Sequence, residues 1–318
     1  MVDRARAFRG VIAASCVLAT LVVGVVDAAK DPAWRRNAAP ALQEAEVLLD
    51  EDALYAHEFN NDSDDGNLTY DYDAARDTYF FCTASYCPVD SIRAWDSGRK
   101  FAVHPNMTNV FVYNTTLDFF WGLQKAPLLF YVGFDAATGH TVLTFEGTVS
   151  SSISSWVNDF RYYMVEPYAG WGWPFDRKVL VEGGFAAGWD KLRDIVYNAT
   201  IDVLEQNAGS SLRLTGHSLG AALACMAAVD FELNGLRVAE VTTFGSPRVG
   251  NLDWAYFYNE DIGLIDRTWR IVNDRDPVPH IPYTGVTFFR GYHHVGIEVW
   301  QKGYNYTQCN DVVPYAMW

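Results

Sequence analysis

The sequence is short of basic residues and of charge in general. Its 318 residues include 24 Lys and Arg against 39 Asp and Glu; only 20% are charged, while 50% are hydrophobic. A chain of this composition can bury a large core, which excludes a disordered or fibrous protein. Its formal charge of −15 would repel phosphate backbones and anionic bilayers at long range. We therefore expect a soluble globular protein without a nucleic-acid partner.

Long hydrophobic runs are also scarce. The only one, Gly10–Val26, follows three arginines and is followed by small residues suited to cleavage after Ala28. This pattern predicts a secretory signal peptide over residues 1–28. An uncleaved anchor is the alternative, but the run is short for a membrane span, which needs about 20 apolar residues. We expect a secreted, extracellular monomer with no stable membrane anchor.

Cysteine is rare, with five in the chain, and Cys16 would leave with the signal peptide. The other four, Cys82, Cys87, Cys225 and Cys309, allow three full pairings. They lack the C-x-x-C spacing of zinc sites and the histidines are scattered, so we expect no metal and no cofactor. Six sequons are glycosylation candidates, any of which could remain unused: Asn61, Asn67, Asn106, Asn114, Asn198 and Asn305.

The organisation of the chain follows from composition and periodicity. After the signal peptide, residues 29–67 form an acidic N-terminal segment without helical or strand period, typical of a flexible arm or pro-segment. Residues 68–318 contain no linker and are expected to form one domain.

Strand-like and helix-like runs alternate in that domain. A helix is expected to begin near Leu68, with Tyr70, Ala74, Phe81 and Ala84 on one face. Leu128–Val132 and Thr141–Phe145 flank a turn and predict a hairpin. Further strands are expected at Leu212–Leu214, Val238–Phe244, Thr268–Val272 and Ile297–Trp300, and a helix at Leu219–Leu233. The pattern predicts an α/β fold with a mostly parallel sheet, helices on both faces and antiparallel edge strands.

The strongest chemical signal is Gly216-His217-Ser218-Leu219-Gly220, between a short strand and an alanine-rich helix. This is the setting of a nucleophile elbow, in which glycines at both flanks permit a turn sharp enough to expose the serine. Ser218 is the candidate nucleophile, and the backbone N–H of Leu219 is one candidate donor of an oxyanion hole.

A serine nucleophile needs a base that a third group orients, and in α/β-hydrolases the order along the chain is Ser, acid, His. Asp274 and Asp276 both follow the predicted Thr268–Val272 strand, and His293 and His294 lie in a later loop. The residues alone do not choose within either pair.

Several motifs together resemble the class 3 (fungal-type) lipases, over roughly Tyr79 to Trp300. They are the Gly216–Gly220 elbow, Thr243–Asn251, Asn273–Pro282 and His294–Trp300. The resemblance implies the α/β-hydrolase fold, with Asp276 as the acid and His294 as the base. It also implies Thr148, at the end of Phe145-Glu146-Gly147-Thr148, as the second oxyanion donor.

The resemblance implies a lid and a disulfide as well. The lid would span residues 149–160, with an apolar face, although an ordinary packed helix remains the alternative; that face is Ile153, Trp156, Val157 and Phe160. The disulfide would be Cys87–Cys309, with Cys82 as the competing partner and Cys225 free. Two departures stand out, because Glu146 replaces the usual arginine and Glu182 replaces the usual histidine of the family.

The expected function is a secreted serine ester hydrolase, similar to a triacylglycerol lipase, that cleaves acylglycerol esters of the triacylglycerol type through an acyl-enzyme. Its expected partners are lipid or other ester substrates at a lipid–water interface. A phospholipase A1 or a feruloyl-type esterase would use the same triad, and fold does not decide among them. A catalytically inactive, lipase-fold binding protein is the alternative from a different class.

Overall fold

A computed structural model describes residues 70–96, 99–119, 124–148, 163–167, 178–273, 275–282 and 291–301. All of them belong to one compact unit, Gly66–Trp318. The expected signal peptide, the acidic N-terminal segment, the lid, Asp274 and Cys309 lie outside the described residues. Within the described part, no helix is both long and apolar enough to cross a bilayer.

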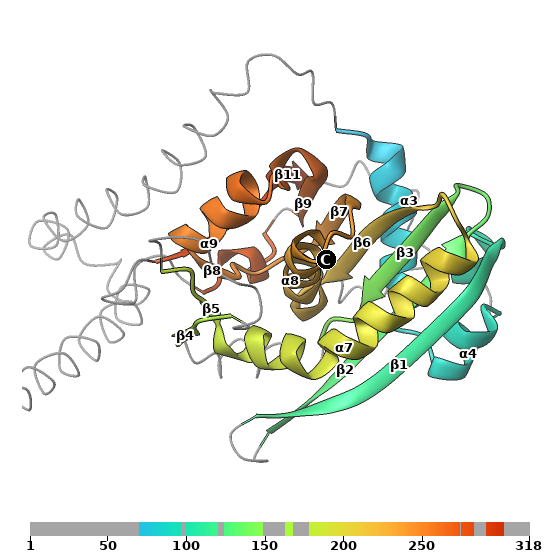
Figure 1. The fold of residues 1–318 in the computed structure, drawn as a ribbon, viewed down its shortest axis with the longest axis horizontal. Helices are drawn as coiled ribbons and strands as arrows, with labels where there is room; N and C mark the ends of the chain where they lie inside the picture. Colours follow the sequence, from blue (N-terminus) through green and yellow to red (C-terminus); the bar gives the residue numbers. More distant parts are fainter. Residues whose placement is uncertain are drawn as a thin grey trace, which may run out of the picture. The chain divides into compact units, whose positions relative to one another are not determined.

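The core of the fold is a seven-stranded sheet (Figure 1). In spatial order the strands are β1 (Met107–Phe119), β2 (Gln124–Asp135), β3 (His140–Phe145), β6 (Ser211–His217), β7 (Val238–Phe244), β9 (Thr268–Asn273) and β11 (Ile297–Gln301). The β1–β2 and β2–β3 pairs are antiparallel, and every later pair is parallel. The predicted fold class is confirmed.

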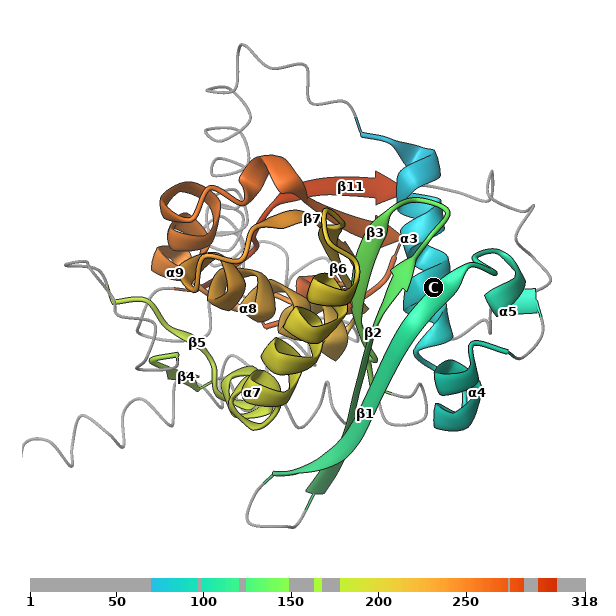
Figure 2. The same ribbon diagram turned by 45° about the vertical axis from the view of Figure 1, so that its right-hand side comes forward.

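Helices cover both faces of this sheet (Figure 2). One face carries α7 (Gly183–Gln206) and α8 (Leu219–Leu233), which share a core cluster with β2, β3, β6 and β7. Thirteen of the fifteen residues of α8 are buried, as expected for a helix that is apolar all round and enclosed by the sheet and α7. Its alanines let it lie close to the strand that precedes it.

The opposite face is covered by α3 (Tyr72–Ala84), which starts where Asp71 accepts a hydrogen bond from the backbone N–H of Ala74, at 3.0 Å. Phe81 and Ala84 are buried as predicted, among residues of β1, β2 and the region of α4 (Val89–Ala94) and α5 (Arg99–Ala102). The predicted start near Leu68 is wrong, because the helix begins at Tyr72 and leaves Tyr70 outside it, and Ala74 is only half-buried. The sheet also buries a second stripe of the helix. Tyr79 and Cys82 pack against residues of β7 and β9.

A second, small sheet lies beyond the carboxyl end of β7. Its strands are β10 (Tyr292–His293), β8 (Gly250–Asn251), β5 (Val181–Glu182) and β4 (Met164–Val165), all paired antiparallel. From β8 the chain runs through α9 (Leu252–Tyr256), a π-helical turn (Phe257–Asp261) and a 3₁₀ turn (Ile265–Arg267) into β9. Another 3₁₀ turn, Val278–His280, follows β9. Pairing of β10 with β8 brings the histidine loop to this edge of the main sheet.

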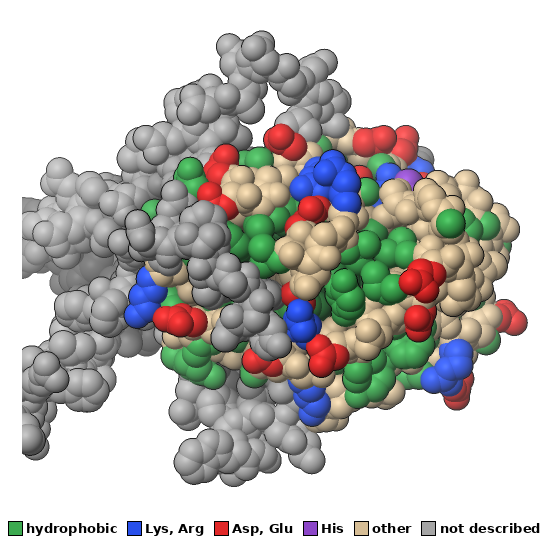
Figure 3. Space-filling model, in the orientation of Figure 1, with side chains coloured by type: hydrophobic (Ala, Val, Ile, Leu, Met, Phe, Trp, Pro, Cys, Tyr) green, Lys and Arg blue, Asp and Glu red, His purple; other side chains and the backbone are tan. Residues whose placement is uncertain are grey.

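Charges are mixed on the face of the molecule shown in Figure 3. Acidic and basic side chains are interspersed with apolar ones there, and among the described residues of that face neither sign forms a continuous patch. That face therefore offers no extended basic surface of the kind that binds nucleic acid.

Candidate active site

Ser218 occupies a strained turn between β6 and α8. Its backbone has φ 53° and ψ −120°, a conformation that L residues rarely adopt. The Ser218 N–H donates to the carbonyl of Phe244 on β7, at 3.1 Å, and α8 begins at the next residue. Strain of this kind is retained where the surrounding structure enforces it, and it is concentrated at functional sites.

The flanking glycines make that turn sterically possible. A Cβ on Gly216 would overlap the backbone carbonyl of Gly220, and a Cβ on Gly220 would overlap the carbonyl oxygen of Phe145. The elbow therefore lies directly against the end of β3, the segment that leads to Thr148. The glycine requirement at both positions has a steric cause.

The Ser218 hydroxyl is buried, and its Oγ has no hydrogen-bond partner. An unpaired buried hydroxyl costs about 1–3 kcal/mol, so such a group calls for an explanation. Thr148 is in the same condition, with a relative exposure of 4% and no partner for its Oγ1. Ser218 follows β6 and Thr148 follows β3, and the ends of these two paired strands meet at the elbow.

A hydrogen-bond chain joins β3 to the elbow through α3. Tyr86, just beyond α3, accepts a hydrogen bond from the backbone N–H of Gly147 at 3.1 Å, and its hydroxyl lies 2.7 Å from Nδ1 of His217. Burial lowers the pKa of His217 to about 4, so its ring is neutral and Nδ1 can accept the Tyr86 proton. The chain fixes Gly147, next to Thr148, relative to His217, next to Ser218. Sequence reasoning missed it, because no local pattern links residues 131 positions apart.

Asp276 lies three residues beyond β9, at the carboxyl edge of the sheet. Its Oδ1 accepts the N–H of Val278 at 2.9 Å, and its Oδ2 lies so close to Gly245 that a Cβ there would be 2.7 Å away. Burial raises the pKa of Asp276 above its usual value, while the Val278 N–H and the charge of His280 act in the opposite direction.

His294 directly follows β10. Its Nε2–H donates to the carbonyl oxygen of Pro279, in the turn after Asp276, at 2.7 Å. Burial holds the pKa of His294 well below its usual value, and the charges of Arg270 and Arg248 lower it further. The ring is therefore neutral at pH 7, which is the form a general base must have before reaction.

The structure brings the three predicted residues to one edge of the sheet but not into a hydrogen-bonded triad. Ser218 Oγ has no partner, and no hydrogen bond joins Asp276 to His294. The imidazole is instead directed at Pro279. Catalytic hydrogen bonds often form only when substrate is present, so this geometry does not exclude the roles of these residues.

Two glutamates, of which Glu182 is buried and Glu146 is half-buried, stand where the resemblance implies basic residues. Burial raises the pKa of Glu146, at the end of β3, to about 7. Burial likewise raises the pKa of Glu182 to about 7, although the N–H of Phe185 donates to its carboxylate at 2.9 Å and partly offsets the effect. Glu182 is the N-cap of α7, a role that histidine could not fill in the same way.

The Glu182 carboxyl gives a pH-dependent prediction. Its folded-state pKa of about 7 exceeds the ordinary 4.5, so its contribution to stability is complete below pH 4.5 and is lost as the pH rises through 7. Glu182→Gln keeps an oxygen acceptor for Phe185 and should reduce the fall in urea midpoint between pH 5 and pH 8. Glu205→Gln, on the exposed side of α7, is the control and should leave that fall unchanged. Equal pH dependence in all three proteins would contradict the assignment.

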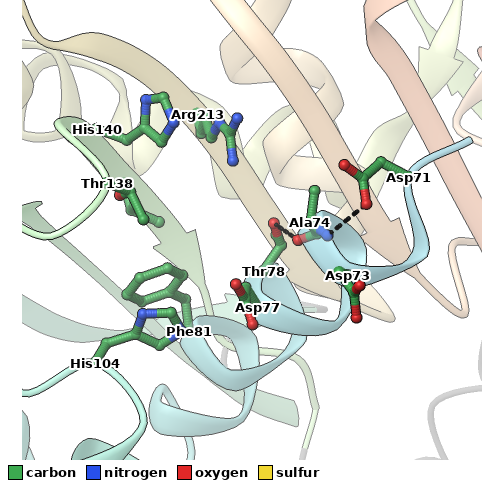
Figure 4. A pocket seen from close by; sticks show the side chains of 11 residues that line it. Asp71, Asp73, Ala74, Asp77, Thr78, Phe81, His104, Thr138, His140 and Arg213 are labelled. Carbon is green, nitrogen blue, oxygen red and sulfur yellow. Dashed lines mark hydrogen bonds between the residues drawn. The ribbon is translucent and has the colours of Figure 1, made fainter.

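A separate hollow of about 320 Å³ lies at the other end of the sheet (Figure 4). Its lining includes His140 and Arg213, near the amino ends of β3 and β6, and Asp77 of α3. Ser218 follows the carboxyl end of β6, so this hollow is not the elbow site. Among the residues that the structure describes, no His, Cys, Asp and Glu side chains cluster as a metal site would require.

The remaining predicted sites are accessible to different degrees. Cys82 and Cys225 are buried, whereas Cys87 is half-buried. Of the six sequons, the three on described residues have exposed asparagines: Asn106, Asn114 and Asn198. Asn61, Asn67 and Asn305 lie outside the described residues.

Known proteins resemble this chain in sequence and fold. Residues 142–286 match the family Lipase (class 3). The sequence is 34% identical over 170 residues to secreted mono- and diacylglycerol lipase A of Penicillium cyclopium (54% of this chain, 50% of that protein). It is 30% identical over 175 residues to secreted mono- and diacylglycerol lipase 1 of Fusarium solani (54% and 47%). The chain thus spans about half the length of these curated relatives.

A solved structure of a lipase relative also resembles this chain in fold. The crystal structure of a mutant MDLA from Penicillium cyclopium aligns with a TM-score of 0.58 and 26% identity, covering 74% of this chain and 83% of that one. A parallel sheet with helices on both faces and a serine on a strained strand-to-helix turn define the α/β-hydrolase fold. Within that class, residues 142–286 of the chain match the class 3 lipases. The family resemblance found in the sequence is confirmed.

Proposed function

We propose that this protein is a secreted serine ester hydrolase that cleaves acylglycerols. Ser218 attacks the ester carbonyl, His294 takes the serine proton, and Asp276 orients the imidazole. The backbone N–H groups of Leu219 and Thr148 stabilise the tetrahedral oxyanion. Water activated by His294 then releases the fatty acid from the acyl-enzyme.

The backbone of Ser218 is the single observation that carries this proposal. A strained, non-glycine elbow at the carboxyl edge of a parallel sheet costs free energy and is typical of a functional site. To complete the triad, the His294 ring must leave Pro279 and turn toward Ser218 and Asp276. The ring is already neutral, but its proton is on Nε2, where it is donated to Pro279. Besides the rotation, this step therefore requires the tautomer in which Nδ1 carries the proton and donates to Asp276, so that Nε2 can take the serine proton.

The acylglycerol class is supported by curated relatives that match about half of this chain and are named mono- and diacylglycerol lipases. The apolar spacing of Ile153, Trp156, Val157 and Phe160 in the sequence supports a lid that opens at a lipid–water interface. A signal peptide over residues 1–28 and an acidic segment over 29–67 complete the proposed organisation.

Hydrolysis rates across a substrate panel test the proposed specificity. We expect mono- and diacylglycerols to be cleaved faster than phosphatidylcholine and methyl ferulate. Preference for phosphatidylcholine would identify a phospholipase, and preference for methyl ferulate a feruloyl-type esterase. A folded protein inactive on all substrates would instead support a binding protein.

We also propose the disulfide Cys87–Cys309. Closing a loop of over two hundred residues would stabilise the protein by about 5 kcal/mol in the chain-entropy model, less any strain. Peptide mapping of the unreduced protein should yield a linked Cys87–Cys309 peptide, while Cys225 alkylates only after unfolding. A linked Cys82–Cys309 peptide, or no linked peptide, would contradict this pairing.

A further inference from the structure

The loop that carries His294 is held at both ends. On the upstream side, β10 pairs with β8, with His293 opposite Gly250. On the downstream side, Gly296 lies at the entry to β11, where the chain packs against the start of β9. His294 thus lies between two segments whose backbone is fixed, and the position of its ring depends on both.

The downstream anchor is a side chain from another element. Oδ1 of Asn259 accepts the backbone N–H of Gly296 at 2.9 Å. Asn259 has a relative exposure of 4%, so water does not compete for this hydrogen bond. The two residues are 37 positions apart in the sequence, and the contact joins the segment after α9 to the histidine loop.

The local backbone is shaped for this contact. Asn259 belongs to the π-helical turn Phe257–Asp261, in which the N–H of Ile262 donates to the carbonyl of Phe257 at 2.9 Å. Such turns are rare and are frequent at functional sites. The turn is fixed to β9 by the Tyr258 hydroxyl, 2.9 Å from Oγ1 of Thr268.

Gly296 is also closely packed, so a shift of its backbone would disturb its neighbours. Its φ is +67°, and a Cβ would overlap the Thr268 side chain, so the backbone of this residue lies directly on β9. Val295, between Gly296 and His294, is buried in the main core. Because only the tightly packed Val295 separates the two residues, a displacement of Gly296 would also displace the backbone of His294.

We infer that Asn259 is a positioning residue, which fixes the backbone of the proposed base His294 by accepting the Gly296 N–H. This inference rests on the proposed function, because positioning matters only if His294 acts in the reaction. Asn259 does not touch the reacting atoms. A misplacement of about 1 Å at a catalytic group can lower the rate by about 100-fold.

The test compares one substitution that removes the acceptor with one that keeps it. Asn259→Leu has similar volume and no acceptor, whereas Asn259→Asp keeps an oxygen for Gly296. With p-nitrophenyl butyrate, we expect Asn259→Leu to lower kcat by roughly 10- to 100-fold with KM within about twofold of wild type, and Asn259→Asp to retain kcat within about threefold. Circular dichroism gives the folded fraction of each variant, and rates are expressed per folded molecule.

Three results would overturn the inference: wild-type kcat in Asn259→Leu, equal losses in both variants, or a loss explained by the unfolded fraction. If Asn259→Leu does not fold, Asn259→Ser takes its place, because its shorter hydroxyl does not reach Gly296. Ser218→Ala is measured in parallel. Full activity in Ser218→Ala rejects the proposed function together with this inference, whereas an inactive Ser218→Ala beside an unimpaired Asn259→Leu rejects the positioning role alone.

Discussion

Ser218→Ala should abolish ester hydrolysis while leaving the protein folded. Removing the nucleophile of a serine triad lowers kcat by about 10⁶. The fold should tolerate the change, because Ser218 Oγ makes no hydrogen bond that would be lost, and alanine removes a buried unpaired hydroxyl. The measurement is kcat on a short p-nitrophenyl ester together with the urea midpoint.

The matched control is Ser246→Ala. Ser246 is also buried, at a loop that follows a parallel strand, but its hydroxyl donates to the carbonyl of Pro247 at 3.1 Å. We expect this variant to lose some stability and to keep its activity. A folded Ser218→Ala with activity within tenfold of wild type would remove Ser218 from the mechanism.

The second large effect distinguishes two adjacent histidines. His294→Ala should lower kcat by about as much as Ser218→Ala, because the residues of a triad act as a unit. His293→Ala should keep activity within about tenfold, since His293 lies in β10 and has no proposed chemical role. The two variants are assayed side by side at pH 7.

The hydrogen bond between His294 and Pro279 suggests a third variant for the comparison of the two histidines. His294→Gln should also be inactive, because its amide can still donate a hydrogen bond to Pro279 but has no basic nitrogen that could take the serine proton. Severe loss in His293→Ala with a mild effect in His294→Ala would shift the assignment of the base by one residue.

Local patterns predicted the parallel part of the fold closely. The helix Leu219–Leu233 and the strand Val238–Phe244 have the predicted boundaries, because continuous apolar runs end at clear turn residues such as Asn234 and Gly235. The 135–139 turn and both strands of its hairpin were also predicted. Such segments are buried on both faces, so their local apolar pattern is sufficient to predict them.

Other elements could not be read from the sequence. In β1, the residues Tyr113-Asn114-Thr115-Thr116 interrupt the apolar pattern, because this edge strand is half exposed. The long helix α7 begins at two glycines, which argue locally against a helix; the Glu182 cap and the core contacts of the helix overcome that preference.

The site was predictable only where the chemistry is local. The elbow is encoded within five residues, so its strand, turn and helix follow from sequence. Tyr86 and Asn259 act through hydrogen bonds to Gly147 and Gly296, which are far away in the sequence, and no periodicity reveals such pairs. Glu146 and Glu182 were visible as departures from the family, but their raised pKa values depend on burial that only the fold provides.

Covalent trapping with a dialkylglycerol phosphonate p-nitrophenyl ester tests the central claim most directly. The reagent mimics the tetrahedral intermediate and forms a stable bond to an activated serine, releasing p-nitrophenol. We predict that intact-mass and peptide analysis will find one adduct per chain, on Ser218, and that Ser218→Ala will form none. The absence of an adduct on the folded wild-type protein, or an adduct on another residue, would contradict the proposal that Ser218 is the nucleophile of an acylglycerol hydrolase.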